Sequence, residues 1–277
     1  MMPFIFVGGH AFASYGIAVA TGMFVNYYIL RADLRRRRLN LNALGLISAI
    51  CVTGLICSKL YRILQWPGRY WSHPAALLNR SGFTFYGAVI GAVVVIILLA
   101  RRLRVPAATL FDTVSAEAAL GYGFGRLGCL LAGDGDYGVP TSLPWGMTFP
   151  HGLLPTLVPV HPTPIYEMLG AMTIAWYLWR LGSPARSAPP GLVFANYLLW
   201  TGIARFLVEF IRRNPRIYLN LSNAQWVALA SISTGVIWLI FLSLRQRTPL
   251  PPPFTFIART DDRAMRLCDE SAKRAAV

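Results

Sequence analysis

One arginine and two aspartates lie within a glycine-rich stretch of apolar sequence, residues 121–138 (GYGFGRLGCLLAGDGDYG). Arg126 falls inside an apolar segment, whereas Asp134 and Asp136 fall in the turn that follows it. An arginine or aspartate at the centre of a membrane helix costs roughly 2.5–3.5 kcal/mol on insertion scales, so such residues indicate a functional site. Close helix packing would explain the glycines. It does not explain the charges, and we interpret the stretch as a binding or catalytic site.

A second charged group lies near the end of a later apolar segment. Arg205, Glu209 and Arg212 are spaced i, i+4 and i+7, so they share one face of a helix, and Glu209 can pair with either arginine. Guanidinium groups are permanently charged and bind phosphate through a planar fork, and glycine-rich turns add backbone N–H donors. Arginines from two segments that face each other would therefore suit a phosphate headgroup. A buried ion pair that only fixes helix order remains the alternative for Arg205 and Glu209.

The composition indicates an integral membrane protein. Of 277 residues, 55% are hydrophobic and only 13% are charged, whereas soluble domains carry about 25% charged residues. The apolar runs are continuous rather than alternating, which favours membrane helices over a barrel. The net charge of +15 comes mostly from residues that flank these runs, which indicates topology and anionic lipid rather than nucleic acid. The four cysteines form no C-x-x-C pair, so we expect no disulfide framework and no metal site.

We therefore predict an all-α integral membrane protein with about seven transmembrane helices. The expected spans are 4–30, 41–64, 82–100, 106–130, 161–180, 191–211 and 224–244. A long proline-containing loop, 133–162, joins the fourth and fifth spans. The run TPLPPP at 248–253 cannot continue a helix, so we place a polytopic membrane catalytic domain at 1–247 and a proline-rich linker with a polar tail at 248–277.

The distribution of basic residues predicts the orientation. Most lysines and arginines fall in segments 31–38, 101–104 and 180–186 and in the C-terminal tail, which a seven-span arrangement places on one side. The positive-inside rule assigns that side to the cytoplasm. We expect the N-terminus and the loop 133–162 to face outward and the tail to be cytoplasmic.

The segment GRLGCLLAGDGDYG resembles the signature of the prolipoprotein diacylglyceryl transferase family, which reads approximately G-R-x-G-N-F-x-N-x-E-x-x-G. Further blocks are similar to those of the family and occur in the same order, over about residues 10–245. These blocks are SYG (14–16), SKLYRIL (58–64), FTFYGAVIG (83–91), HPTPIYE (161–167) and ARFLVEFIRRNP (204–215).

The resemblance implies an enzyme of the bacterial cytoplasmic (inner) membrane that needs no cofactor. It would move the diacylglyceryl group of phosphatidylglycerol to the lipobox cysteine thiol of a prolipoprotein, and glycerol phosphate would leave. The implied partners are phosphatidylglycerol, prolipoprotein signal peptides and membrane lipid, without nucleic acid. The implied catalytic residues are Arg126, Arg205, Asp134 and Tyr86. Asp136 has no counterpart in the family pattern and is added as a catalytic candidate because it lies in the same turn as Asp134. The implied substrate-binding residues are Tyr15, Lys59, Gly125, Gly128, Gly138, His161, Tyr166, Glu167, Glu209 and Arg212.

The sequence departs from the family pattern where a base is expected. Tyr86 replaces a histidine, Cys129 and Ala132 replace asparagines, Asp134 replaces a glutamate and Lys59 replaces an arginine. A tyrosine with a pKa near ~10 is a poor base at neutral pH unless an arginine lowers that pKa. The candidate bases are therefore Asp134, Asp136, Tyr86 and His161.

Two other functions remain open on the sequence alone. A paralogue in the family could use the same lipid cavity with another acceptor, as the replaced histidine and asparagines would allow. A non-catalytic membrane protein, such as a transporter, could bind anionic lipid or an organic anion. Transporters often show two pseudo-repeated halves, and no such halves are evident in this chain.

Overall fold

The computed structural model describes residues 2–72, 83–186 and 188–247. The chain divides into two compact units, Met1–Leu242 and Ser243–Val277. The first unit holds the elements below except the last residues of the final helix. The predicted linker and tail at 248–277 lie outside the described residues, so the predicted domain boundary stays a prediction.

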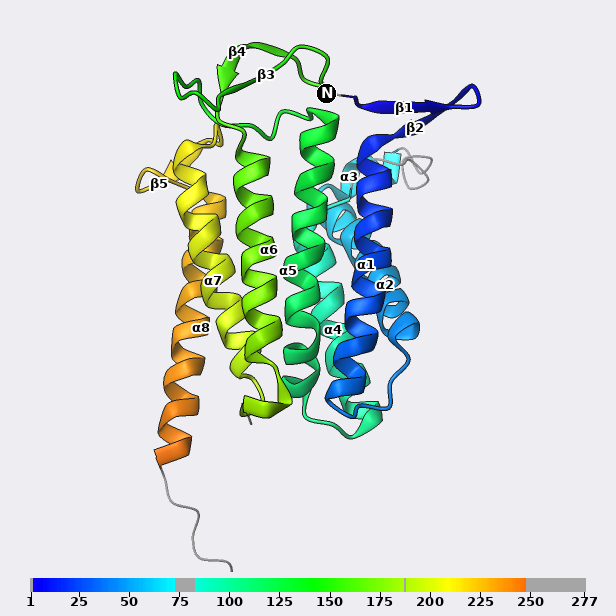
Figure 1. The fold of residues 1–277 in the computed structure, drawn as a ribbon, viewed down its shortest axis with the longest axis vertical. Helices are drawn as coiled ribbons and strands as arrows, with labels where there is room; N and C mark the ends of the chain where they lie inside the picture. The colour runs from blue at the N-terminus through cyan, green and yellow to red at the C-terminus, as the bar shows by residue number, and fades with distance from the viewer. Residues whose placement is uncertain (1, 73–82, 187, 248–277) are drawn as a thin grey trace, which may run out of the picture. The chain divides into compact units, whose positions relative to one another are not determined.

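Long helices make up most of the first unit, and each predicted span is helical over most of its length (Figure 1). The long helices are α1 (Ser14–Arg36), α2 (Ala43–Gln65), α4 (Phe85–Leu103), α5 (Ala107–Ala132), α6 (Thr163–Leu181), α7 (Leu192–Val208) and α8 (Asn223–Arg247). Short helical segments are α3 (Pro67–Ser72), η2 (Pro184–Arg186) and η3 (Glu209–Ile211). Within the described residues, four helices are long and apolar enough to cross a membrane: α2, α4, α7 continued by η3, and α8. Helices α1, α5 and α6 are not among these four.

The predicted start of the first span is wrong. Strands β1 (Phe4–Val7) and β2 (His10–Ala13) form an antiparallel hairpin, and α1 begins directly after it. Gly8 and Gly9 have φ angles of 58° and 81°, which glycine adopts readily and which suit a two-residue hairpin turn. The Gly-Gly pair between two short apolar runs is thus a hairpin signal. Tyr15 consequently lies in the first turn of α1 rather than in the middle of a span.

Short β-strands also occur outside the helices, so the prediction of an all-α protein is correct for the long elements but not for the connecting segments. Strands β3 (Met147–Phe149) and β4 (Thr156–Val160) pair antiparallel within the loop after α5. Strands β5 (Arg216–Tyr218) and β6 (Leu221–Ser222) pair just before α8. Ser222 and Gln225 then exchange backbone-to-side-chain hydrogen bonds of 2.9 and 3.2 Å, which form a capping box for α8.

Helix α5 packs against α1, α6, α7 and α4 (Figure 1). Small side chains permit this, since Ala116 and Ala119 of α5 are buried against Ala175 and Leu178 of α6. Helix α4 also packs closely against α2. A Cβ at Gly87 of α4 would lie 2.5 Å from a backbone oxygen of α2. These contacts place α5, which carries Arg126, between its neighbours.

The acidic residues of α5 have different surroundings. Asp112 accepts hydrogen bonds of 2.7 and 2.8 Å from the backbone N–H groups of Gly191 and Phe194 at the start of α7. Glu117 is also buried, but neither of its carboxylate oxygens has a hydrogen-bond partner among the described residues. Asp112 therefore accepts hydrogen bonds from N–H groups in the first turn of α7 that have no partner within that helix, whereas Glu117 has no such role.

We expect Asp112→Ala to lower the free energy of unfolding by about 1–3 kcal/mol, because it leaves two N–H groups of α7 unsatisfied. Glu117→Gln should be nearly neutral, because glutamine has the same shape and the change breaks no hydrogen bond with a described residue. Thermal unfolding of the purified protein in detergent, followed by helical circular dichroism, compares the two. Equal losses in both variants would contradict this assignment.

Candidate functional site

Three arginines from separate parts of the chain meet at the carboxylate of Glu167, in the first turns of α6. Nη1 of Arg205, on α7, lies 2.7 Å from Oε1 of Glu167. Nη1 of Arg212, just after η3, lies 2.7 Å from Oε2, and Nε of Arg126, on α5, lies 3.4 Å from the same oxygen. Glu167 is buried, so this charge is shared away from bulk water. The structure thus brings together the arginines that the sequence singled out and makes Glu167 their common partner.

Two further carboxylates extend the network. Asp136 pairs with both Arg126 and Arg212, and its Oδ1 lies 2.5 Å from Nη2 of Arg212. Oε2 of Glu209 lies 3.0 Å from Nη2 of Arg205 and 4.0 Å from Nε of Arg212. Arginines and carboxylates therefore alternate through the cluster. Arg212, which the sequence analysis assigned to substrate binding rather than catalysis, contacts all three carboxylates.

The arginines set the protonation of Asp136. Burial raises the pKa of this carboxyl, but the guanidinium groups of Arg212 and Arg126 outweigh it, so the pKa lies below the ordinary value for aspartate. Asp136 therefore stays ionised well into the acid range. Its ion pairs are fully formed at neutral pH and are lost only as the pH falls through that lowered pKa.

The acidic turn has its shape because of its glycines and a threonine. Gly133 and Gly135 have φ angles of 58° and 93°, so the chain leaves α5 in the left-handed region and then reverses. Oδ1 of Asp134 accepts a hydrogen bond of 3.2 Å from the backbone N–H of Asp136. Thr163 is the first residue of α6, and its hydroxyl donates a 2.5 Å hydrogen bond to the carbonyl of Asp136. Thr163 thus ties the start of α6 to the acidic turn.

Gly138 joins three segments of the site through its backbone. Its N–H donates to the carbonyl of His161 at 2.8 Å, and the next N–H, of Val139, donates to the carbonyl of Ile211 at 2.8 Å. A Cβ at residue 138 would lie 2.5 Å from that Ile211 oxygen. Gly138 therefore permits close packing beside Arg212, and its assignment to substrate binding stays a prediction.

The other two glycines assigned from the sequence have different surroundings. A Cβ at Gly128 would lie 2.8 Å from Cδ2 of Tyr15, so this glycine makes room for the tyrosine ring against α5. A Cβ at Gly125 would meet no heavy atom within 4 Å. Open space therefore adjoins Arg126 on the same helix.

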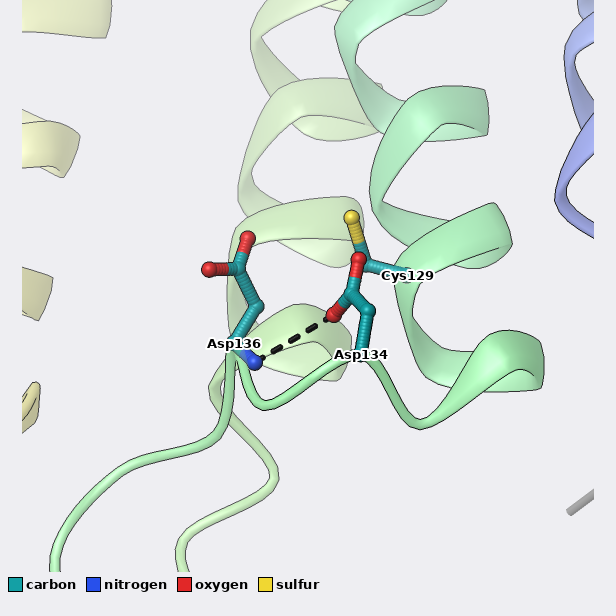
Figure 2. A group of neighbouring side chains, drawn as sticks. All are labelled: Cys129, Asp134 and Asp136. Atoms are coloured by element: carbon teal, nitrogen blue, oxygen red, sulfur yellow. Dashed lines mark hydrogen bonds between the residues drawn. The ribbon is translucent and has the colours of Figure 1, made fainter. Parts of the chain in front are cut away.

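Cys129, Asp134 and Asp136 form a tight group beside Arg126, with their ligand atoms within 4.8 Å of one another (Figure 2). This group does not suit a metal ion, because Arg126 already pairs with Asp136 and its Nη1 lies 3.9 Å from Sγ of Cys129. Asp134 differs from its neighbour. Among the described residues it forms no ion pair with lysine or arginine. The two carboxylates of the turn therefore have different partners, since Asp136 pairs with two arginines.

The other predicted residues have contacts outside the cluster of arginines and carboxylates. Nδ1 of His161 lies 3.4 Å from the hydroxyl of Tyr166, which accepts a 2.8 Å hydrogen bond from Nε1 of Trp145. Tyr86, the second residue of α4, is 42% exposed, and within the described part of the chain its ring contact is with Phe85. Lys59, on α2, holds its ammonium group 5.1 Å from the centre of the Phe83 ring.

Sequence reasoning missed Tyr122. Its hydroxyl donates a 2.6 Å hydrogen bond to Oε1 of Glu167, and the guanidinium of Arg126 lies 4.8 Å from the centre of its ring. The spacing contained a usable signal, because Tyr122 is four residues before Arg126 and shares its helix face. Asn214 and Ser222 were also missed, and both donate to Oε1 of Glu209, at 2.6 and 2.8 Å.

Long apolar helices around a buried cluster of arginines and carboxylates define an integral membrane protein with a charged site among its helices. The family model for prolipoprotein diacylglyceryl transferase matches residues 3–241. The chain belongs to this family, as its signature blocks predicted.

Several bacterial relatives are similar over most of the chain, and each is named a phosphatidylglycerol–prolipoprotein diacylglyceryl transferase. The protein of Bordetella avium is 36% identical over 193 residues, 67% of this chain and 71% of the relative. That of Clostridium tetani is 30% identical over 241 residues, 85% of this chain and 96% of the relative. That of Geobacter sulfurreducens is 31% identical over 260 residues, 89% of this chain and 97% of the relative.

Proposed function

We propose that the protein transfers the diacylglyceryl group of phosphatidylglycerol to the thiol of a prolipoprotein lipobox cysteine. Family membership supports this activity, and one observation carries it to particular residues: Arg126, Arg205 and Arg212 converge on Glu167 beside the acidic turn. A guanidinium has more N–H donors than two carboxylate contacts use, so the arginines keep donors for a phosphate while the carboxylates orient them.

The reaction places growing negative charge where these arginines lie. The thiolate sulfur forms a bond to the terminal glyceryl carbon, the bond from that carbon to the phosphate oxygen breaks, and glycerol phosphate leaves with the electron pair. The phosphate passes from a monoanionic diester towards a dianionic monoester. Cations fixed at the phosphate therefore bind the transition state more tightly than the ground state. We assign this role to Arg126 and Arg205, with Arg212 holding the anions that position them.

The thiol must also lose its proton, because the thiolate is the nucleophile. We assign the base to Asp134. Asp136 is held between two guanidinium groups, which stabilise its charged form and make it a weaker base. Asp134 accepts one backbone hydrogen bond and is only partly buried, in the same turn. Tyr86 and His161 are thereby left without a role in proton transfer.

We expect Asp134→Asn to lower kcat by about 10²-fold, within the usual range for loss of a general base, and to abolish the acid limb of the pH–rate profile. Asp136→Asn should also lower the rate but should keep that limb. If Asp136 were the base, the acid limb would lie below the usual aspartate range of about 4, because its pKa is lowered. A limb in that range that disappears in Asp136→Asn would reassign the base.

We propose further that α1, α5 and α6 cross the membrane with the four apolar helices, which places the protein in the bacterial cytoplasmic membrane with seven spans. The packing of α5 against α1, α4, α6 and α7 supports this arrangement. The basic segments at 31–38, 101–104 and 180–186 support a cytoplasmic C-terminus and an outward N-terminus and loop 133–162. A membrane-impermeant protease should cut the loop 139–160 in intact spheroplasts and spare the tail. Cleavage of the tail alone would reverse the orientation.

The activity is tested with the purified full-length protein in phosphatidylglycerol liposomes and a lipobox peptide, by peptide mass. We expect the mass to rise by one diacylglyceryl group. A peptide with serine for the lipobox cysteine, and liposomes of phosphatidylcholine alone, are the controls. Absence of the increment, from folded protein that binds phosphatidylglycerol, would overturn the proposal. Two alternatives would then remain: an enzyme that uses an acceptor other than the lipobox cysteine, or a non-catalytic protein that binds anionic lipid.

A further inference from the structure

A second cluster of arginines lies far from the site described above. Arg36, Arg37 and Arg38, at the end of α1, line a cavity of about 370 Å³ together with residues 182–184 and Ala188 of the α6–α7 connection. Glu167 lies near the start of α6, whereas the cavity lies beyond its end at Leu181. With a rise of about 1.5 Å per residue, the two sites are roughly 20 Å apart along the helix.

Contacts within the protein hold two of these guanidinium groups in place. The buried carboxylate of Asp33 pairs with Arg36 and lies 2.9 Å from Nε of Arg37. Nη1 of Arg36 donates a 2.9 Å hydrogen bond to the carbonyl of Trp179, and its guanidinium lies 3.8 Å from the centre of that indole ring. The arginines are thus oriented before any ligand arrives, which lowers the entropic cost of binding.

The backbone of the α6–α7 connection lies close to the arginines. A Cβ at Gly182 would collide with the guanidinium of Arg37, so glycine lets that group lie against the α6–α7 connection. Arg38 has a φ angle of 56°, in the left-handed region where glycine or asparagine is usual after a helix. Arg38 therefore occupies a position after α1 at which an arginine side chain does not favour the backbone conformation.

The arginines of the cavity form ion pairs with fewer carboxylates than the arginines around Glu167 do, and the buried Asp112 and Glu117 of α5 also interact electrostatically with Arg37. Three guanidinium groups line it, and within the described residues the carboxylate paired with them is the single buried one of Asp33. The side chain of Arg38 forms no ion pair or hydrogen bond with another described residue, and it is exposed. Guanidinium forks bind phosphate oxygens in a bidentate manner, and a volume near the lower end of ligand cavities, roughly 300–1,000 Å³, suits a headgroup rather than an acyl chain.

We propose that this cavity is a second anion site that binds the phosphate group of an anionic lipid headgroup or of a soluble phosphate monoester. The arginines of the cavity would hold the phosphate oxygens, and Asp33 and Trp179 would hold the arginines. Lipid chains, where present, would lie outside along α6, on which Trp176 is 61% exposed with Arg180 over its ring at 5.4 Å. This binding is separate from diacylglyceryl transfer.

The test measures binding without turnover. Full-length protein in detergent is mixed with phosphatidylglycerol or phosphatidylcholine, and retained lipids are counted by native mass spectrometry. Thermal unfolding with inorganic phosphate or glycerol phosphate forms the second arm. The variants are Arg38→Ala, which is exposed and should not disturb folding, and Gly182→Leu, which fills the cavity. The matched control is Arg101→Ala/Arg102→Ala, which removes exposed positive charge from the last turn of α4.

We expect both cavity variants to retain one phosphatidylglycerol fewer than the wild type, with at least a tenfold lower occupancy, while the control retains it. That result assigns the site to lipid. The active site also binds phosphate under the proposed function, so some stabilisation by soluble phosphates should remain in every variant. A smaller stabilisation in the cavity variants than in wild type and control, without a difference in lipid count, assigns the cavity to a free phosphate. Equal loss in the control, or no difference between the cavity variants and wild type in either arm, overturns the proposal.

Discussion

Arg126→Ala should lower kcat/KM for transfer from phosphatidylglycerol by about 10³-fold, within the range seen when a cation at a transferred phosphate or an oxyanion donor is removed. The guanidinium is largely buried between Asp136 and Glu167, so its loss leaves two carboxylates facing the place where phosphate charge develops. Arg126→Lys should recover only part of the activity, because an ammonium group keeps the charge but cannot bridge two carboxylates and a phosphate in one plane. Initial rates over a range of lipid concentrations measure the effect.

The matched control for Arg126 is Arg213→Ala. Arg213 lies at the same end of the helices, exposed and with its guanidinium 5.8 Å from the centre of the Tyr137 ring. Its substitution removes the same charge from the surface near the site and should change the rate less than about threefold. If both variants lose activity equally, the positive field near the membrane surface, rather than a fixed contact, would explain the effect of Arg126.

Glu167→Gln should lower kcat by about 10²-fold and also reduce stability. Glutamine has the same shape, but it removes the charge that three arginines share, and breaking a buried ion pair by removing one partner costs roughly 3–5 kcal/mol. Glu167 acts on the substrate through the arginines and is a positioning residue. The expected signature is therefore a fall in kcat with an unchanged or lower KM for the lipid, because freed guanidinium groups still bind phosphate but in the wrong places.

Glu117→Gln is the control for Glu167→Gln, since it removes a buried carboxylate that has no hydrogen-bond partner among the described residues. Its kcat and KM should both match the wild type. A rise in KM with unchanged kcat in Glu167→Gln would show that Glu167 contributes to substrate binding alone, and the positioning role would be discarded.

Much of the helical framework could be predicted from the sequence, because continuous apolar runs and their basic flanks mark membrane helices directly. The helices α2 and α4 begin and end within about three residues of their predicted bounds. The predicted first span begins too early, because the apolar character of residues 4–13 hides the hairpin that Gly8 and Gly9 form. The turn-forming glycines decide the structure of that region, and the apolar side chains on either side of them suit a strand as well as a helix.

The members of the charged cluster could be named from the sequence, but their pairing could not. Arg205 and Glu167 are separated by 38 residues, and no spacing rule relates residues on different helices. Asp134 and Asp136 are equivalent in the sequence. The positive φ angle of Gly135 turns the chain between them, so that one carboxylate meets two arginines and the other pairs with none of the described ones. Tyr86 entered through the resemblance alone. It is 42% exposed on α4 and forms no ion pair or hydrogen bond with the cluster among the described residues, so its catalytic role stays a prediction.

The alternation of arginines and carboxylates around Glu167 also bears on how the protein is made. Helices α5 and α6 are not apolar enough to count among the four candidate spans, and they carry Arg126 and Glu167. During insertion Arg126 and Glu167 can pair with each other once both helices are in place. The network is complete only when α7 brings Arg205 and the segment after η3 brings Arg212. Completion of the charged network would then be the step that commits the late helices to the bilayer. Substitutions there should be checked for abundance in the cell before any loss of activity is interpreted.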